Sequence, residues 1–114
     1  MTTIYHNPRC GTSRNVLQAL QDRGIQADVV EYLNTPLSGD ELRELIQSAG
    51  LTPREAIRSK EALFDELGLG DAGVGDDQLI DAMAAHPVLM NRPFVVTEKG
   101  ARLCRPATIL EEIL

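Results

Sequence analysis

The sequence has little of what several large classes of protein require. It contains 2 cysteines in 114 residues, too few to build the disulfide framework of a small secreted domain. No apolar run approaches the ~20 residues that a membrane-spanning helix needs, so we expect no contact with a membrane. The first residues carry neither a basic patch nor a long apolar segment, which argues against a signal peptide. We therefore expect a protein of the cytoplasm.

An excess of basic residues is also missing. The chain has 11 Lys and Arg residues against 17 Asp and Glu residues, and its formal net charge is -6. Because phosphate contacts need a basic face, this charge argues against a nucleic-acid-binding protein, although a few placed residues can still make a local basic pocket. The apolar fraction of 43% and the absence of repeats predict a single globular domain over residues 1–114, and we expect a monomer.

The hydrophobic periodicity and the turn residues predict short strands and helices along the chain. The expected strands are 2–5, 27–33, 94–97 and 101–104. The expected helices are 13–23, 39–49, 53–59, 61–67, 77–85 and 106–114, and 68–75 is expected to be a flexible surface connection. Ser38 with Glu41 three residues later predicts a capped start for the second helix, and Asp76 is expected to cap the fifth.

The order of these elements predicts the fold class. A strand, a helix and a second strand form a parallel pair with a crossover. The two strands near the end of the chain form an antiparallel hairpin in which Gly100 takes a left-handed conformation. Together they predict an α/β protein with a four-stranded mixed sheet and helices around it. This plan resembles that of thioredoxin, with an all-helical insert at about 38–86.

Cys10 is the residue with the most evident chemistry. It lies in the loop between the first strand and the first helix, where open α/β sheets bind their ligands. The first amides of a helix are unpaired and carry partial positive charge, so a thiol beside them loses its proton readily and an anion can bind there. Arg9, Arg14 and His6 are expected to add positive charge. We therefore predict a reactive thiol rather than a small buried apolar residue.

Two familiar kinds of thiol site do not fit the residues around this cysteine. A Cys-x-x-Cys dithiol needs a second cysteine at position 13, which is Ser13. A phosphatase-like anion loop needs an arginine six residues after the cysteine, and Val16 stands there. No cluster of His and Cys has the spacing of metal ligands, so we expect no metal and no bound cofactor. The pattern predicts a single thiol in its own loop.

Three arginines further along the chain are candidates for binding an anion beside this thiol. Arg58 is expected at the end of a short helix, and Arg92 and Arg105 each precede a proline on either side of the hairpin. In a thioredoxin-type fold the proline before the third strand is commonly cis and faces the thiol, so we predict a cis Arg92–Pro93 peptide. Arg92 and Arg105 would then emerge near Cys10. The alternative for each arginine is a solvated surface charge.

The segment HNPRCGTSRN, residues 6–15, resembles the active-site signature of the glutaredoxin-linked arsenate reductases. Residues 76–81, 86–93 and 102–106 are similar to that family too, so the resemblance covers essentially the whole chain. It implies a thioredoxin-like fold and an oxidoreductase that reduces arsenate to arsenite. It also implies glutathione as co-substrate and glutaredoxin as the partner that resolves the mixed disulfide.

The same resemblance implies roles for individual residues. Cys10 would be the nucleophile and His6 the group that favours its thiolate form. Pro93 would have a structural role. The residues that hold the oxyanion or line its loop would be Arg58, Arg92, Arg105, Ser13 and Arg14.

Two other functions stay open, and the second cysteine needs its own interpretation. A related protein with the same thiol and arginines could reduce another substrate, because oxyanion clamps select weakly between tetrahedral anions. An Spx-like regulator that binds RNA polymerase is the other alternative, but such proteins typically carry the Cys-x-x-Cys that Ser13 removes. We expect Cys104 to be buried in a strand of the hairpin and to be structural rather than a resolving thiol.

Overall fold

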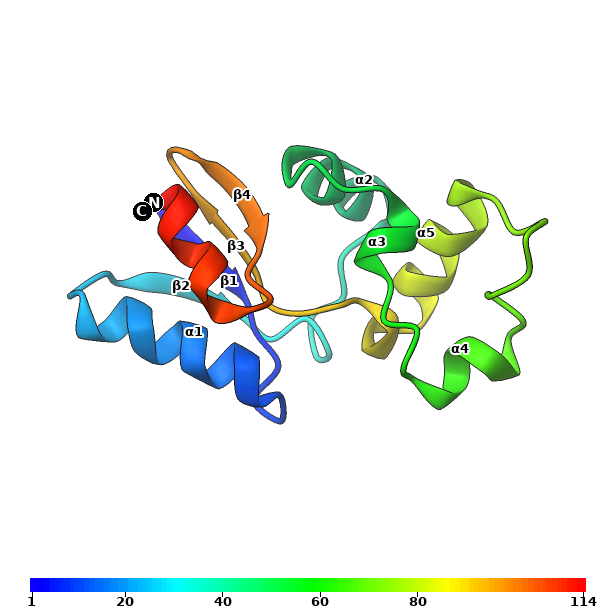
Figure 1. The fold of residues 1–114 in the computed structure, drawn as a ribbon, viewed down its shortest axis with the longest axis horizontal. Coiled ribbons are helices and arrows are strands. Elements are labelled where there is room, and N and C mark those ends of the chain that lie inside the picture. Colours follow the sequence, from blue (N-terminus) through cyan, green and yellow to red (C-terminus); the bar gives the residue numbers. More distant parts are fainter. The chain divides into compact units, whose positions relative to one another are not determined.

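The computed structural model describes residues 1–114, and the chain folds into two compact units (Figure 1). Met1–Thr35 and Arg92–Leu114 form the first, which contains every strand and is called the sheet unit below. Pro36–Asn91 forms the second, the helical unit, which corresponds to the predicted all-helical insert. No helix in either unit is both long enough and apolar enough to cross a membrane.

The sheet unit is built on four strands in the order β2-β1-β3-β4 (Figure 1). β1 (Thr2–Tyr5) pairs in parallel with β2 (Ala27–Val30) and antiparallel with β3 (Phe94–Thr97). β3 continues into an antiparallel hairpin with β4 (Gly100–Leu103). The helix α1 (Gly11–Asp22) supplies the crossover that two neighbouring parallel strands require. The predicted α/β class and the four-stranded mixed sheet are therefore confirmed.

An apolar core of the sheet unit lies between the sheet and two helices, α1 and the 3-10 helix η2 (Ala107–Ile113). Ile4 of β1 and Val95 of β3 are direct partners in the sheet, so both side chains point to the same face. The other fully or nearly fully buried members of this core are Val16, Leu20, Cys104, Leu110 and Ile113. Because this packing fixes α1 against β1, it also fixes the loop that joins them.

The hairpin turns at Glu98 and Lys99, and Thr97 pairs with Gly100 across the turn. Gly100 has a φ of 140°, a positive value that glycine adopts without a steric penalty. The positive φ predicted for this residue is therefore confirmed. β4 ends at Leu103, which leaves Cys104 just outside the strand in which we expected it.

The helical unit consists of five short helices. They are α2 (Gly39–Ser48), α3 (Pro53–Ala56), α4 (Ala62–Glu66), α5 (Asp76–Ala85) and η1 (Pro87–Leu89). Ser38 caps α2 in the predicted capping box with Glu41, and Thr52 forms an equivalent box with Glu55 at α3. α5 packs against α2 and α3 within this unit. The short helix η1 was not predicted.

Two of the predicted helices were wrong at their ends. α1 begins at Gly11 rather than at 13, because Cys10 already has the extended backbone of an N-cap, with φ -96° and ψ 121°. α3 ends at Ala56 rather than at 59. Ile57 is extended there and forms an isolated bridge with Met90, and this long-range pairing ends the helix.

Two further boundaries were also wrong. Asp76 is not the cap of α5, since Gly75 is its N-cap and the side-chain oxygen of Gln78 accepts the Gly75 backbone N–H at 2.8 Å. β2 ends at Val30 rather than at 33, because the chain turns at Glu31, whose carbonyl oxygen accepts two backbone N–H groups. In both cases a local hydrogen bond decides where the element begins or ends.

Candidate active site

A tight turn from Asn7 to Cys10 joins β1 to α1. The Cys10 backbone N–H donates to the Asn7 carbonyl oxygen at 3.0 Å, and Asn7 Oδ1 accepts the Arg9 backbone N–H at 2.9 Å. Asn at the first position and Pro8 at the second are typical of such a turn. Asn7 was not among the predicted site residues, although the Asn-Pro pair is a recognised turn signal that could have identified it.

Cys10 is the N-cap residue of α1 and is only 8% exposed. Burial alone would raise the pKa of its thiol, but three donors outweigh it. The Ser13 backbone N–H and the guanidinium groups of Arg105 and Arg92 lower the pKa to about 7 from 9.0. The thiolate is therefore well populated at neutral pH, as the position at the helix N-terminus led us to predict.

Arg92 precedes β3 and Arg105 follows β4, and the guanidinium groups of both lie at the Cys10 sulfur. Arg105 Nη1 lies 3.5 Å from Cys10 Sγ and also donates to the Arg92 carbonyl oxygen at 3.3 Å. The predicted cis Arg92–Pro93 peptide is present. The Arg105–Pro106 peptide is also cis, which was not predicted. The expectation that both arginines emerge near Cys10 is therefore confirmed.

His6 and Ser13 are buried together beneath the turn. His6 Nδ1 and Ser13 Oγ share a hydrogen bond of 2.6 Å, and Ser13 Oγ also accepts the Asn7 backbone N–H at 3.1 Å. Burial lowers the pKa of His6 from 6.5, Glu31 opposes this shift and Arg14 adds to it. His6 is therefore neutral at pH 7, and the expectation that it adds positive charge was wrong. His6 instead contacts Ser13, whose backbone N–H faces the Cys10 sulfur.

The remaining predicted site residues lie elsewhere. Arg14 is exposed, and its Nη1 donates to the Pro8 carbonyl oxygen at 2.9 Å across the outside of the turn. Arg58 belongs to the helical unit and lies beyond the end of α3 rather than at it. Its backbone N–H donates to the Leu89 carbonyl oxygen at 2.7 Å, and its Nε lies 3.7 Å from a carboxylate oxygen of Glu61. Its place in the site stays a prediction.

Cys104 is a contrasting thiol in the same unit. It is fully buried in the apolar core, as expected, and forms no disulfide. Burial, with a smaller contribution from Glu112, raises the pKa of its thiol to about 12. It is therefore protonated throughout the physiological pH range.

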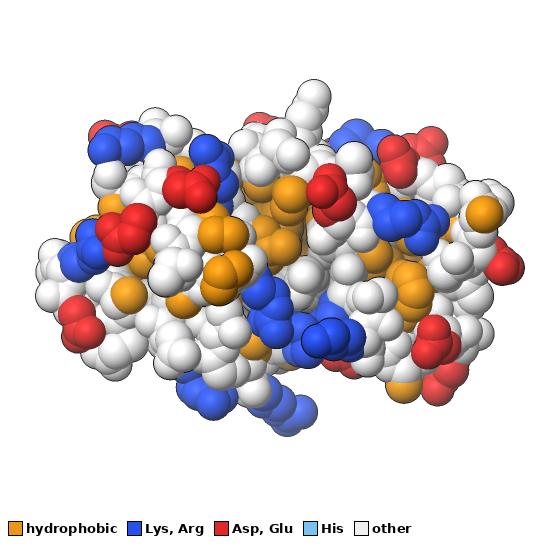
Figure 2. Space-filling model, in the orientation of Figure 1, with side chains coloured by type: hydrophobic (Ala, Val, Ile, Leu, Met, Phe, Trp, Pro, Cys, Tyr) orange, Lys and Arg blue, Asp and Glu red, His pale blue; other side chains and the backbone are white.

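The surface arginines of the sheet unit differ from those at the thiol. Figure 2 shows acidic and basic side chains close together over this unit, at the left of the view. Arg23 pairs with Glu111, and Arg102 Nε lies 3.1 Å from a carboxylate oxygen of Glu112. Exposed pairs of this kind contribute only about 0–1 kcal/mol each. Arg105, in contrast, directs its guanidinium at a sulfur.

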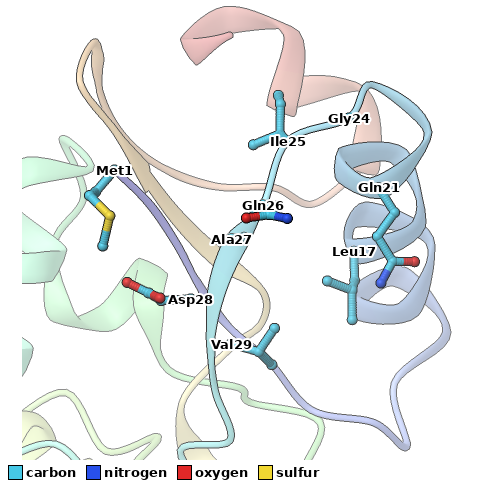
Figure 3. A pocket seen from close by; sticks show the side chains of 9 residues that line it. All are labelled: Met1, Leu17, Gln21, Gly24, Ile25, Gln26, Ala27, Asp28 and Val29. Carbon is cyan, nitrogen blue, oxygen red and sulfur yellow. The ribbon is translucent and has the colours of Figure 1, made fainter.

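A separate hollow on the sheet unit does not contain this chemistry. It has a volume of about 640 Å³ and lies along β2 and α1, where Figure 3 shows Leu17 and Gln21 projecting beside the strand. None of the predicted site residues lines it, and its side chains include no thiol and no arginine. No group of three His, Cys, Asp or Glu side chains could hold a metal ion. The candidate active site is therefore the turn at Cys10.

Comparison with known proteins shows the family of the chain. Residues 5–113 match the ArsC family. The chain belongs to the ArsC family. An arsenate reductase from Rhizobium meliloti (strain 1021) is 56% identical over 112 residues, covering 98% of this chain and 80% of that protein. An arsenate reductase from Escherichia coli is 50% identical over 112 residues, 98% of this chain and 79% of its own length.

A solved structure of an arsenate reductase supports the fold directly. The arsenate reductase from Vibrio cholerae superimposes with a TM-score of 0.95 at 46% sequence identity, covering 99% of this chain and 97% of that one. The thioredoxin-like resemblance expected from residues 6–15 and from the order of elements is therefore confirmed.

Proposed function

We propose that this ArsC-family protein is an oxidoreductase that reduces arsenate to arsenite, with Cys10 as the nucleophile. The observation that carries the proposal is the 3.5 Å distance between Arg105 Nη1 and Cys10 Sγ. It brings an activated thiol and an anion-binding group to the same point. Two relatives that are 50% and 56% identical over nearly the whole chain are named arsenate reductases, which supports arsenate as the substrate.

Arginine suits this substrate for physical reasons. Arsenate is a tetrahedral oxyanion with more than one negative charge, and a guanidinium group is planar, permanently charged and able to donate to two oxygens at once. In the proposal Arg92 and Arg105 hold the anion while the thiolate attacks it. Arg58 is proposed as a third clamp, and Ser13 and Arg14 as residues of the loop around it.

The proposed reaction has three steps. The Cys10 thiolate attacks arsenic, an S–As bond forms, an As–O bond breaks, and that oxygen leaves as water after taking up protons. A glutathione thiol then attacks the adduct. The two sulfurs join as a Cys10–glutathione disulfide, their two electrons reduce arsenic(V) to arsenic(III), and arsenite leaves. A glutaredoxin thiolate finally takes the glutathione sulfur and regenerates the Cys10 thiolate.

Nothing in this sequence of steps requires a bound metal or cofactor, and glutathione is consumed as a co-substrate. The reaction needs a compartment in which glutathione keeps thiols reduced, so we propose that it takes place in the cytoplasm.

The direct test is arsenate-dependent oxidation of NADPH in the presence of glutathione, glutathione reductase and glutaredoxin. We expect turnover that disappears in Cys10→Ser and persists in the matched variant Cys104→Ser. Turnover that requires glutaredoxin supports the third step. Full activity of Cys10→Ser would contradict the proposal.

A further inference from the structure

Asn7 is bonded through three different atoms in the turn that delivers Cys10 to α1. Its backbone N–H donates to Ser13 Oγ at 3.1 Å, and its carbonyl oxygen accepts the Cys10 backbone N–H at 3.0 Å. Its side-chain Oδ1 accepts the Arg9 backbone N–H at 2.9 Å. The residue is only 3% exposed. These bonds tie the turn both to the cysteine and to the first turn of the helix.

The cysteine needs this support because it is a weak cap. Helix N-caps are normally Ser, Thr, Asp or Asn, whose side-chain oxygens hold themselves in place by accepting an amide of the first turn. Cys10 has no such oxygen, and sulfur is a weaker acceptor. The backbone of the turn must therefore set the place of the sulfur relative to the Ser13 N–H, one of the groups that lower its pKa.

The side chain of Asn7 stabilises that turn by accepting a backbone hydrogen bond inside it. An asparagine that accepts the backbone N–H two residues later restricts the turn to a small set of conformations. The donor here is the Arg9 N–H, directly before the cysteine. Without the acceptor, the Arg9 N–H loses its partner and the peptide that leads into Cys10 is less restricted.

We propose that Asn7 is a positioning residue that holds Cys10 at the N-cap of α1 and so keeps its thiolate within reach of the Ser13 amide. The proposal deepens the proposed function, on which it rests for the role of Cys10 as nucleophile. It assigns to Asn7 no contact with substrate.

The test is the pH dependence of alkylation of Cys10 by iodoacetamide, a neutral reagent, with the labelled peptide identified by mass spectrometry. Asn7→Leu keeps the branching of the side chain and removes the acceptor. Asn7→Ser retains an acceptor that closes such turns more weakly. Asn34→Leu is the matched control, because Asn34 is an exposed asparagine in another turn of the sheet unit.

We expect the pH at the midpoint of Cys10 alkylation to rise from the wild-type protein to Asn7→Ser and further to Asn7→Leu, towards the pKa of a free thiol. Alkylation at pH 7 should be about five-fold slower in Asn7→Leu, while rates at high pH, where every thiol is ionised, stay equal. Asn34→Leu should match the unchanged protein. Arsenate turnover at pH 7 should fall by the same factor as alkylation.

A purely structural role gives a different result. If Asn7→Leu lowers the melting temperature but leaves the midpoint unchanged, the proposal is wrong. If Asn7→Leu does not fold, Asn7→Ser decides: a midpoint above that of the unchanged protein supports the proposal, and an equal midpoint contradicts it. Because alkylation requires no arsenate, a failure of the proposed function would leave this result intact.

Discussion

Cys10 and Cys104 lie in the same unit and are both almost inaccessible to solvent, at 8% and 0% exposed. Their chemistry is nevertheless opposite, since the pKa of one thiol falls to about 7 and that of the other rises to about 12. Cys10 has a helix N-terminus and two guanidinium groups around it, whereas Cys104 is surrounded by apolar side chains and the charge of Glu112. Burial alone therefore does not decide whether a thiol is reactive; the donors that face its sulfur do.

Alkylation of the two thiols in the folded protein should differ most. Because the pKa of Cys10 is lowered, its alkylation should increase as the pH rises through about 7 and then level off. Cys104 should remain unlabelled until the protein unfolds. At pH 7 we expect a ratio of rates on the order of 10³ or more, measured by mass spectrometry of the two peptides. Equal labelling of both cysteines in the native state would contradict the difference in pKa between the two thiols.

Removing a guanidinium should make Cys10 more like an ordinary thiol. In Arg105→Gln the group 3.5 Å from the sulfur loses its charge, so the pKa of Cys10 should rise. Since the same group is proposed to hold arsenate, kcat/KM for arsenate should fall by roughly 10- to 100-fold. Arg23→Gln, which breaks the surface pair with Glu111, is the control and should change neither quantity. An equal loss in both variants would show that the effect is not local.

Cys104→Ser should affect stability without affecting the reaction. A hydroxyl group at this fully buried position should lower the free energy of unfolding by about 1–3 kcal/mol, as measured by urea denaturation. The midpoint of alkylation at Cys10 should stay the same. A loss of arsenate turnover in a folded Cys104→Ser protein would instead assign this thiol a part in the chemistry.

Added phosphate should have the smallest effect on the rate of arsenate reduction. It has the shape and charge of arsenate, so it should compete for the arginines at Cys10, but it cannot be reduced. We expect competitive inhibition with an inhibition constant on the order of millimolar or weaker, reduced further in Arg105→Gln. Inhibition that does not depend on arsenate concentration would contradict a shared site.

The sequence predicts most of the sheet unit because its signals there are local. The β-prone residues of 94–97 and Gly100 at the turn each act within a few residues, as the capping pair of Ser38 and Glu41 does in the helical unit. Cys10 in a loop before a helix was likewise sufficient to predict a reactive thiol. The order of strands then follows from the short connections and the handedness of the crossover.

The sequence-based predictions were wrong where a distant or a buried contact determines the end of a helix or the charge of a side chain. α3 ends early because Ile57 pairs with Met90, which no local pattern indicates. His6 looks like a positive charge in the sequence, but burial beside Ser13 keeps it neutral. The contact between Cys10 and Arg105 spans 95 positions, so the sequence could suggest the arginine but not the distance.

Trapping the mixed disulfide on Cys10 would test its proposed role as the nucleophile. The protein is mixed with arsenate and glutathione in the absence of glutaredoxin, then quenched with acid and digested, and its peptides are analysed by mass spectrometry. We expect glutathione in a disulfide with Cys10, formed only when arsenate is present and in proportion to the arsenite released. Arsenite released without glutathione on Cys10, or with glutathione on Cys104, would contradict it.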